Sequence, residues 1–233
     1  MTGIYAGTSG FSYKEWKGAF YPEKIKPEEM LAFYSSKLPS VEINNTFYRM
    51  PKRAVLEQWA EKVPENFRFV IKASRRITHF KRLHDTDEEV SYLLSQLATL
   101  GERLGCVLFQ LPPNLKADAE RLKNFLASLP GGTPVAFEFR HDSWFEDLVL
   151  DALRDAGAAL CQADTDESKG PNIVATADWG YLRLRREKYS PAALKKWMKA
   201  IQDQDWSHAF VYFKHEDEAA GPKMAGRFMK LTT

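Results

Sequence analysis

Eight short runs rich in β-branched and aromatic residues recur along the chain, and helix-like patterns separate them. This alternation is typical of βα units built around a parallel sheet. The expected strands are residues 4–8, 41–44, 67–74, 106–111, 135–140, 159–164, 181–185 and 210–214. Eight such units favour a closed (β/α)8 barrel of the TIM type. An open doubly wound sheet is the alternative, but GTSGFSYKEW after the first strand is not the glycine-rich phosphate loop of that fold.

Between the expected strands, the chain carries signals for helix starts. Ser143 with Glu146 predicts a capping box, and Ser190 before Pro191 predicts an N-cap followed by a first-turn proline. Residues 163–180 lack a helical pattern, so we expect an irregular segment after the sixth strand. The length of 233 residues fits one barrel domain that spans the whole chain.

The alternation of side chains along each strand predicts which of them face the barrel interior. Glu138 and Arg140 lie opposite the apolar face formed by Val135, Phe137 and Phe139, near the carboxyl end of the fifth strand. The residues expected to share this inward phase on the other strands are Thr8, Glu42, Asn44, Lys72, Ser74, Gln110, Asp164, Arg183, Arg185, Tyr212 and Lys214. Because isolated charges are costly to bury, this rim predicts a wet, polar pocket where barrel enzymes have their active sites.

Individual charged residues of this rim could also serve the stability of the fold and have no part in function. Barrels also bury salt-bridged networks that serve only the fold, and the pairs that would form one here are Glu138 with Arg140 and Glu42 with Lys72.

Several long motifs resemble those of one protein family. They are GTSGFSYKEWKGAFYP, VEINNTFYRMP, FVIKASRRITHFKRL, LFQLPPNL, FEFRHDSW, CQAD and VYFKHED. Spread over essentially the whole chain, they are similar to the YecE-like family, catalogued as domain of unknown function seventy-two. The resemblance implies a TIM-type barrel and no established activity. VYFKHED departs from the Phe-Asn-Asn-Asp of many relatives, which leaves the role of the last strand's end open.

The first functional hypothesis is an enzyme that acts on a phosphorylated or polyhydroxylated small molecule. Arg183, Arg185 and Lys214 follow the last two strands, where barrel enzymes often hold phosphate, and guanidinium groups suit that ligand. The remaining polar rim residues would bind the rest of the substrate. The reaction would be a hydrolase, lyase or isomerase reaction.

Four residues are the catalytic candidates for such an enzyme. Glu138 or Glu42 would act as the general acid or base, and His141 is available for proton transfer. Lys72 would act as an electrophile or, if desolvated, as an amine nucleophile, although a salt bridge with Glu42 is the simpler interpretation.

A glycoside hydrolase is one variant of this hypothesis, because Glu42 and Glu138 could face each other across the barrel mouth. The aromatic residues available to stack on sugar are Phe11, Tyr13, Trp16, Trp144 and Trp179. A cofactor is not specified by the sequence. An oxygen-rich site for a divalent metal from Glu42, Glu138, Asp164 and His141 is conceivable, but the histidines lack the spacing of a zinc site.

The second hypothesis is nucleic-acid binding, with or without phosphodiester cleavage, by the loop of residues 74–84. Its basic residues are Arg75, Arg76, His79, Lys81 and Arg82, with Phe80 between them. Such a loop combines positive charge with a stacking platform, and its binding would weaken steeply with salt. A third hypothesis is a barrel without catalysis that serves as a binding module.

Composition limits the remaining classes. The net charge of +2 argues against a surface built entirely for nucleic acid, and no run approaches the roughly 20 apolar residues of a membrane span. Cys106 and Cys161 lie in apolar runs, which predicts reduced core thiols. The start of the chain lacks a signal-peptide pattern, so we expect a cytoplasmic protein without a membrane partner.

Overall fold

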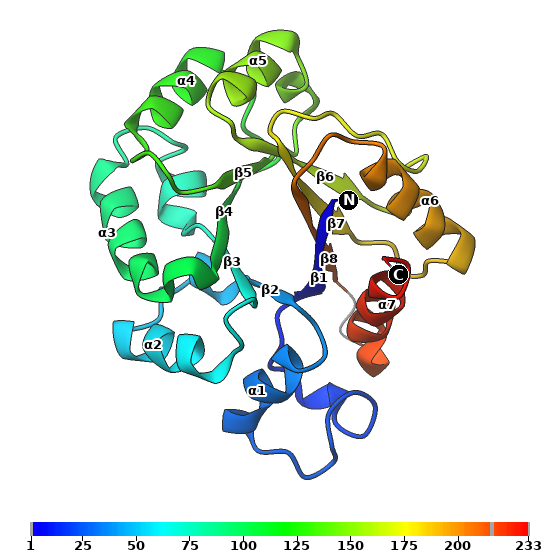
Figure 1. The fold of residues 1–233 in the computed structure, drawn as a ribbon. Helices are drawn as coiled ribbons and strands as arrows, with labels where there is room; N and C mark the ends of the chain where they lie inside the picture. The colour runs from blue at the N-terminus through cyan, green and yellow to red at the C-terminus, as the bar shows by residue number, and fades with distance from the viewer. Residues whose placement is uncertain (1, 215–216, 233) are drawn as a thin grey trace.

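In the computed structural model, which describes residues 2–214 and 217–232, eight parallel strands form a closed barrel (Figure 1). Each strand pairs with the next, and β8 pairs with β1. The strands are β1 Gly3–Ser9, β2 Ser40–Ile43, β3 Arg68–Lys72, β4 Leu104–Gln110, β5 Val135–Glu138, β6 Ala159–Asp164, β7 Trp179–Leu184 and β8 His208–Phe213. The expected (β/α)8 barrel is confirmed.

Helices surround the barrel on its outer side (Figure 1). They are α1 Met30–Ser35, α2 Arg53–Lys62, α3 Asp87–Leu97, α4 Ala119–Ser128, α5 Asp147–Asp155, α6 Pro191–Gln202 and α7 Ala220–Met229. Short 3-10 helices are η1 Lys14–Trp16, η2 Pro27–Glu29, η3 Asn45–Phe47, η5 Ala98–Arg103, η6 Asp142–Trp144 and η7 Asp217–Ala219, and η4 Arg76–Phe80 is a π-helix. Residues 165–178 contain no helix, which confirms the irregular segment after β6.

Of the two helix starts predicted at Ser190 and Ser143, the first is confirmed and the second is wrong. Ser190 caps α6 by accepting a hydrogen bond from the backbone N–H of Ala193 at 3.1 Å, as expected. The capping box at Ser143 was wrong, because Ser143 lies in η6 and its hydroxyl accepts a hydrogen bond from the N–H of Ala117 at 2.8 Å. Among the described residues, no helix is long and apolar enough to cross a membrane.

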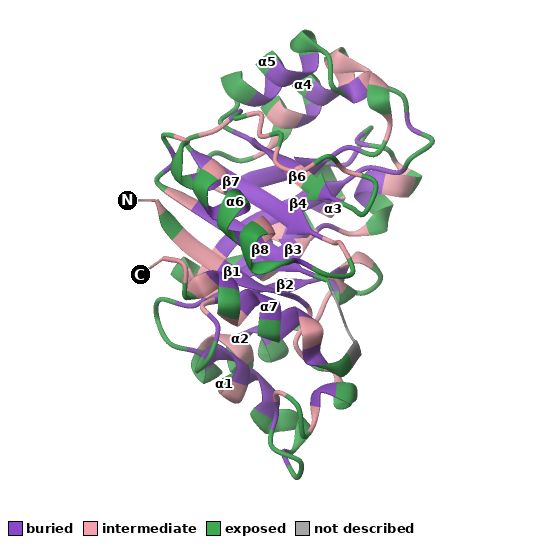
Figure 2. Ribbon diagram, turned by 90° about the vertical axis from the view of Figure 1, so that its right-hand side faces the viewer, coloured by how far each residue is buried: buried purple, intermediate pink, exposed green. Residues whose placement is uncertain are grey.

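The strands separate two apolar cores, and successive residues along a strand contribute to one and then the other. The outer core lies between strands and helices, and Figure 2 shows the buried strands inside more exposed helices. The inner core fills the barrel with Val70, Cys106, Leu108, Ala136, Ala159, Cys161, Trp179, Tyr181, Phe210 and Tyr212. Both cysteines are therefore buried and free, as the sequence predicted.

The predicted inward phase was wrong for Thr8 and Asp164. Thr8 shares its phase with Ala6 of the outer core, and its hydroxyl lies 2.8 Å from that of Tyr34 on α1. Asp164 shares its phase with Leu160 and accepts two hydrogen bonds from the Arg186 guanidinium, at 2.7 and 2.9 Å. Both side chains have polar partners outside the barrel, which satisfies them there.

Close packing between β1 and β2 depends on a glycine. A Cβ atom on Gly7 would lie 1.9 Å from the backbone oxygen of Ser40, its partner in the sheet. Ser40 in turn lies within the barrel, where its hydroxyl is 2.5 Å from that of Tyr212. Tyr212 therefore faces inward as predicted, but it is fully buried and belongs to the inner core.

Candidate functional site

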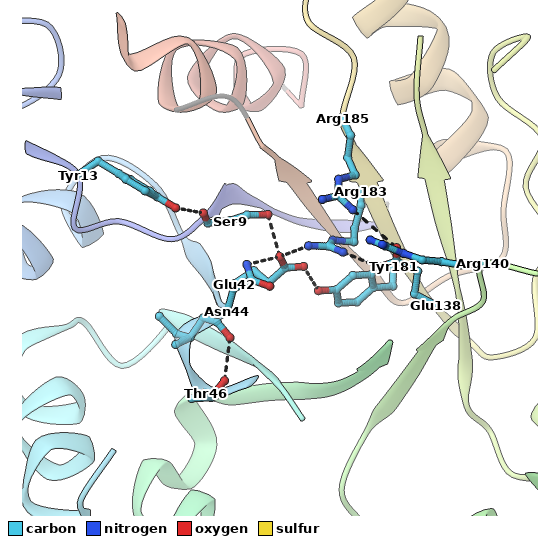
Figure 3. A network of polar contacts seen from close by, with 11 residues as sticks. Ser9, Tyr13, Glu42, Asn44, Thr46, Glu138, Arg140, Tyr181, Arg183 and Arg185 are labelled. Carbon is cyan, nitrogen blue, oxygen red and sulfur yellow. Dashed lines mark hydrogen bonds and ion pairs between the residues drawn. The ribbon is translucent and has the colours of Figure 1, made fainter. Parts of the chain in front are cut away.

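The carboxyl ends of the strands carry a buried ionic network centred on Arg183 of β7 (Figure 3). Its Nη2 donates to Oε1 of Glu42 at 2.8 Å, and its Nη1 donates to Oε2 of Glu138 at 2.5 Å. All three side chains are at most 3% exposed. One guanidinium therefore bridges two carboxylates inside the barrel, whereas the expected Glu42–Lys72 pair is not formed.

Glu42 on β2 is held by further hydrogen bonds. Ser9 and Asn44 donate to Oε1 at 2.7 and 2.8 Å, and the Tyr181 hydroxyl donates to Oε2 at 2.5 Å. Burial by itself raises the pKa of Glu42, but Arg183 and these donors outweigh it and lower the pKa to about 2. Glu42 is thus an ionised carboxylate at neutral pH.

Glu138 on β5 is surrounded by three arginines. Besides Arg183, Arg140 donates to its Oε1 at 3.2 Å, and Arg185 lies 3.7 Å from the same oxygen (Figure 3). Burial raises the pKa of Glu138, but the three positive charges lower it overall. The buried carboxylates in turn raise the pKa of Arg183 despite the desolvation of its guanidinium.

A pocket of about 520 Å³ lies over this network at the barrel mouth. Five of its lining side chains are cationic, and they are Lys72, Arg140, Arg183, Arg185 and Lys214. The other lining residues are Ser9, Tyr13, Asn44, Asn45, Phe47, Tyr48, His79 and Gln110. Within the described part of the chain, the lining contains no carboxylate. The five cations of the lining therefore outnumber the two carboxylates beneath the pocket.

Lys72 ends β3 and presents its amine to this pocket. Its Nζ lies 4.2 Å from the centre of the Phe47 ring, and it has no ion pair with any described residue. Burial and the Arg183 charge are the main causes that lower the pKa of Lys72 to about 8. Lys72 is thus mostly protonated at pH 7, but roughly a tenth of its amine is neutral there, far more than for a lysine of ordinary pKa.

Gln110 has a side-chain oxygen for which the described part of the chain offers no hydrogen-bond partner. The side chain is 3% exposed, and its buried Oε1 has no hydrogen-bond partner among residues 2–214 and 217–232. The same holds for Nε of Arg183. Since buried polar atoms are nearly always paired, these two atoms are suited to contact a bound molecule.

The match to known proteins covers nearly the whole chain. A family model described as "Protein of unknown function DUF72" matches residues 5–233. The chain belongs to this family. A DUF72 protein of Thermotoga maritima has a similar solved structure, with a TM-score of 0.85, 29% identity and 99% of each chain covered. The DUF72 protein of Enterococcus faecalis, at 20% identity and a TM-score of 0.77, covers 100% of this chain and 98% of that one and shares the fold.

Curated relatives of this DUF72 chain have names that describe no activity. The UPF0759 protein YunF of Bacillus subtilis is 26% identical over 92% of this chain and 79% of its own length. The UPF0759 protein YecE of Escherichia coli is 31% identical over 61% of this chain and 50% of its own length. The expected family is confirmed, and the function has to be inferred from the site.

Several residues named from the sequence lie outside the pocket of this DUF72 barrel. His141 accepts a hydrogen bond from the N–H of Ser143 at 3.2 Å and caps η6. Ser74 lies in a neighbouring hollow, and its hydroxyl accepts from the N–H of Arg76 at 3.3 Å. The proposed metal ligands are not assembled, and no group of three or more potential ligands occurs in the described part of the chain.

The aromatic residues expected to stack on sugar are mostly core residues. Trp16 and Trp144 are 1% exposed, Trp179 belongs to the inner core, and Phe11 packs against the outer core. Only Tyr13 of this set lines the pocket.

Sequence reasoning missed part of the lining. Ser9 was overlooked because its neighbour Thr8 was assigned the inward phase. Asn45, Phe47 and Tyr48 follow β2 in the VEINNTFYRMP motif, and they line the pocket because loops at the carboxyl ends of barrel strands surround its mouth. Their position after a strand was the available signal.

The basic loop beside the pocket is partly neutralised. Arg76 and Lys81 both bind Glu89 of α3, at 3.1 and 2.8 Å. The Arg75 guanidinium lies 5.5 Å from the Tyr48 ring centre and 5.2 Å from that of Phe80. His79 lines the pocket and contacts Phe47 edge-on, whereas Arg82 has no ion pair with any described residue.

Proposed function

We propose that the pocket binds a small anionic molecule, most favourably a phosphorylated metabolite, and that it is the active site of an enzyme. The observation that carries this proposal is the set of five cationic side chains around a pocket whose described lining has no carboxylate. Glu42 and Glu138 lie beneath it and are already bound to Arg183. These two carboxylates, which also lie beside Arg140 and Arg185, balance only part of the charge of the five cations, so an anionic ligand would supply further counter-charge.

The uncharged lining suits the rest of such a ligand. Asn44, Asn45 and Gln110 carry amide groups that both donate and accept hydrogen bonds, as sugar hydroxyls do. A phosphorylated, polyhydroxylated compound would therefore use both kinds of lining residue.

The site geometry supports a division of roles that differs from the sequence-based hypothesis. Glu42 and Glu138 are buried and saturated with donors, so we assign them the positioning of Arg183 rather than acid–base catalysis. Lys72, with its lowered pKa and its place at the pocket, is the better candidate for proton transfer or nucleophilic attack.

Thermal unfolding with a panel of ligands tests this proposal. Sugar phosphates should raise the melting temperature, whereas the same sugars without phosphate should have little effect. A ligand at 100 times its Kd adds about 2.7 kcal/mol, which such an experiment resolves. Arg185→Ala and Lys214→Ala should weaken the response, and Arg154→Ala and Lys199→Ala on exposed helix surfaces serve as matched controls.

Equal responses to phosphorylated and unphosphorylated sugars would reject the anion-binding role. Binding of sugar phosphates without turnover of any of them would support a binding module instead of an enzyme.

Single-stranded nucleic acid is a second candidate ligand, favoured by the surface around Arg75. The Arg75 guanidinium lies near the rings of both Tyr48 and Phe80, two residues that are 70% and 66% exposed. Exposed rings beside a cation form a platform on which bases can stack. Binding of a short oligonucleotide that weakens steeply with salt and is lost in Phe80→Ala would support this candidate. Retention of that binding in Phe80→Ala would count against it.

A further inference from the structure

We infer that Lys72 forms an imine with the carbonyl carbon of an anionic substrate, so that the pocket selects phosphorylated aldehydes or ketones. This inference rests on the anion-binding function proposed above and specifies the chemistry of the same site.

The geometry brings together the two parts that this chemistry needs. Lys72 presents its amine to the same pocket as Arg140, Arg185 and Lys214. A phosphate held by these cations would keep the remainder of a small substrate within the pocket, near the amine. Positioning of this kind makes amine attack effectively intramolecular.

The backbone that carries Lys72 is held in place, and the amine has no ion pair with a described residue. The backbone oxygen of Lys72 accepts a hydrogen bond from the Thr46 hydroxyl at 2.7 Å, which fixes the end of β3. The Phe47 ring lies on one side of Nζ, with its centre 4.2 Å from that atom. No carboxylate among the described residues lies within ion-pair distance of Nζ, although Glu42 and Glu138 are the nearby negative charges.

The surroundings favour the neutral amine that such a reaction requires. Burial, Arg183 and Arg140 lower the pKa of Lys72, Glu138 and Glu42 oppose them, and the result is about 8. The positive charge of Lys72 in turn contributes to the lowered pKa of His79, which lines the same pocket.

The proposed step balances without any further reactant. The neutral Nζ attacks the carbonyl carbon and forms a C–N bond, and proton transfer to oxygen gives a carbinolamine. Loss of water then gives the C=N bond of the imine, and hydrolysis reverses the step. An imine stabilises a carbanion on the adjacent carbon, so this chemistry favours a lyase or isomerase over a hydrolase.

Reductive trapping tests the inference directly. The protein is incubated at pH 8 with glycolaldehyde phosphate and sodium cyanoborohydride, which delivers hydride to the imine carbon and leaves a stable secondary amine. Peptide mapping by mass spectrometry then locates the adduct. At pH 8 about half of the Lys72 amines are neutral, against fewer than about 1% for a lysine of ordinary pKa. We therefore expect labelling of Lys72 roughly tenfold or more faster than that of exposed lysines.

Four comparisons complete the experiment. Unphosphorylated glycolaldehyde should label Lys72 much more slowly, inorganic phosphate should slow labelling by the phosphorylated probe, and Lys72→Met should remove this adduct. Lys195→Met, on the exposed side of α6, should leave it unchanged.

The outcomes separate this inference from the proposed function. One possible result is that inorganic phosphate binds in calorimetry, but adducts are spread over exposed lysines and are not enriched at Lys72. This result would overturn imine formation and leave the anion-binding function standing. Fast labelling of Lys72 by both aldehydes, without phosphate competition, would reject the anion pocket and with it the selection of phosphorylated carbonyls. Because the unmodified protein gives these results, they do not depend on the folding of any variant.

Discussion

Arg183 and Glu42 are 141 residues apart in sequence and form an ion pair of 2.8 Å inside the barrel, where their side chains are 3% and 0% exposed. The pair connects β7 with β2 through the interior. With Glu138 on the second guanidinium nitrogen, it forms a rigid charged floor for the pocket. The floor fixes the position of Arg183, so the more exposed cations above it are the ones left to bind a ligand.

Removal of the central guanidinium should destabilise the protein strongly. Arg183→Met leaves two buried carboxylates without their counter-ion, and loss of one partner from a buried pair typically costs about 3–5 kcal/mol. The free energy of unfolding, measured with urea, checks this. Arg53→Met breaks an exposed pair with Glu57 and should cost less than about 1 kcal/mol. Equal effects of the two substitutions would contradict a stabilising role for the network.

Acid should unfold the protein through the same carboxylates. The pKa of Glu42 is lowered from 4.5 to about 2 in the folded state, and that of Glu138 is also lowered. The unfolded chain therefore binds more protons, so the stabilisation is complete above about pH 4.5 and is lost as the pH falls toward 2. Urea titrations between pH 6 and pH 2 measure this slope, and Glu42→Gln should reduce it. A free energy that is constant across this range would refute the assignment.

The approach of β1 to β2 should not tolerate a methyl group. In Gly7→Ala, the new Cβ would lie 1.9 Å from the Ser40 carbonyl oxygen, and overpacking of this kind costs about 1–3 kcal/mol or more. Gly131→Ala is the matched control, because no described atom lies within 4 Å of the added Cβ. Thermal unfolding of both variants checks the difference, and a wild-type melting temperature in Gly7→Ala would show that the strands can separate at little cost.

Gln110 should matter more for binding than for folding. Gln110→Met removes an unpaired buried oxygen and keeps the volume, so the free energy of unfolding should change by less than about 1 kcal/mol. Affinity for a polyhydroxylated phosphate should fall about tenfold, equivalent to about 1.4 kcal/mol, while that for inorganic phosphate should persist. Calorimetry with the polyhydroxylated phosphate and with inorganic phosphate measures both affinities. A large loss of stability with unchanged affinity would instead make Gln110 a core residue.

The fold could be predicted from the sequence because hydrophobic periodicity reports directly on strands and helices. The prediction of which side chains face the barrel interior was correct for strands with one clearly apolar face, as for Glu138 on β5 and Arg183 on β7. It was wrong for Thr8 and Asp164 because β1 and the start of β6 are apolar or small on both faces, so the pattern carries no information on phase. Their actual partners, Tyr34 and Arg186, come from other segments.

The pairing of charges was beyond sequence analysis for a similar reason. From the sequence, Lys72 was the expected salt-bridge partner of Glu42 on the charged rim. In the structure the longer, forked side chain of Arg183 reaches both Glu42 and Glu138 and leaves Lys72 unpaired among the described residues. Only the three-dimensional arrangement decides which of several cations on one rim reaches a given carboxylate.

The bridge by Arg183 also bears on how the chain folds as it is synthesised. Glu42 and Glu138 leave the ribosome before Arg183, because β7 is the seventh of eight strands. A nascent chain that ends after β6 has Arg140 beside Glu138 but no arginine for Glu42, so a dry interior at that stage would bury the Glu42 carboxylate without its ion pair. We therefore expect the interior to close around Glu42 only after β7 has delivered Arg183, which makes closure of the barrel a late step in the folding of a newly made chain.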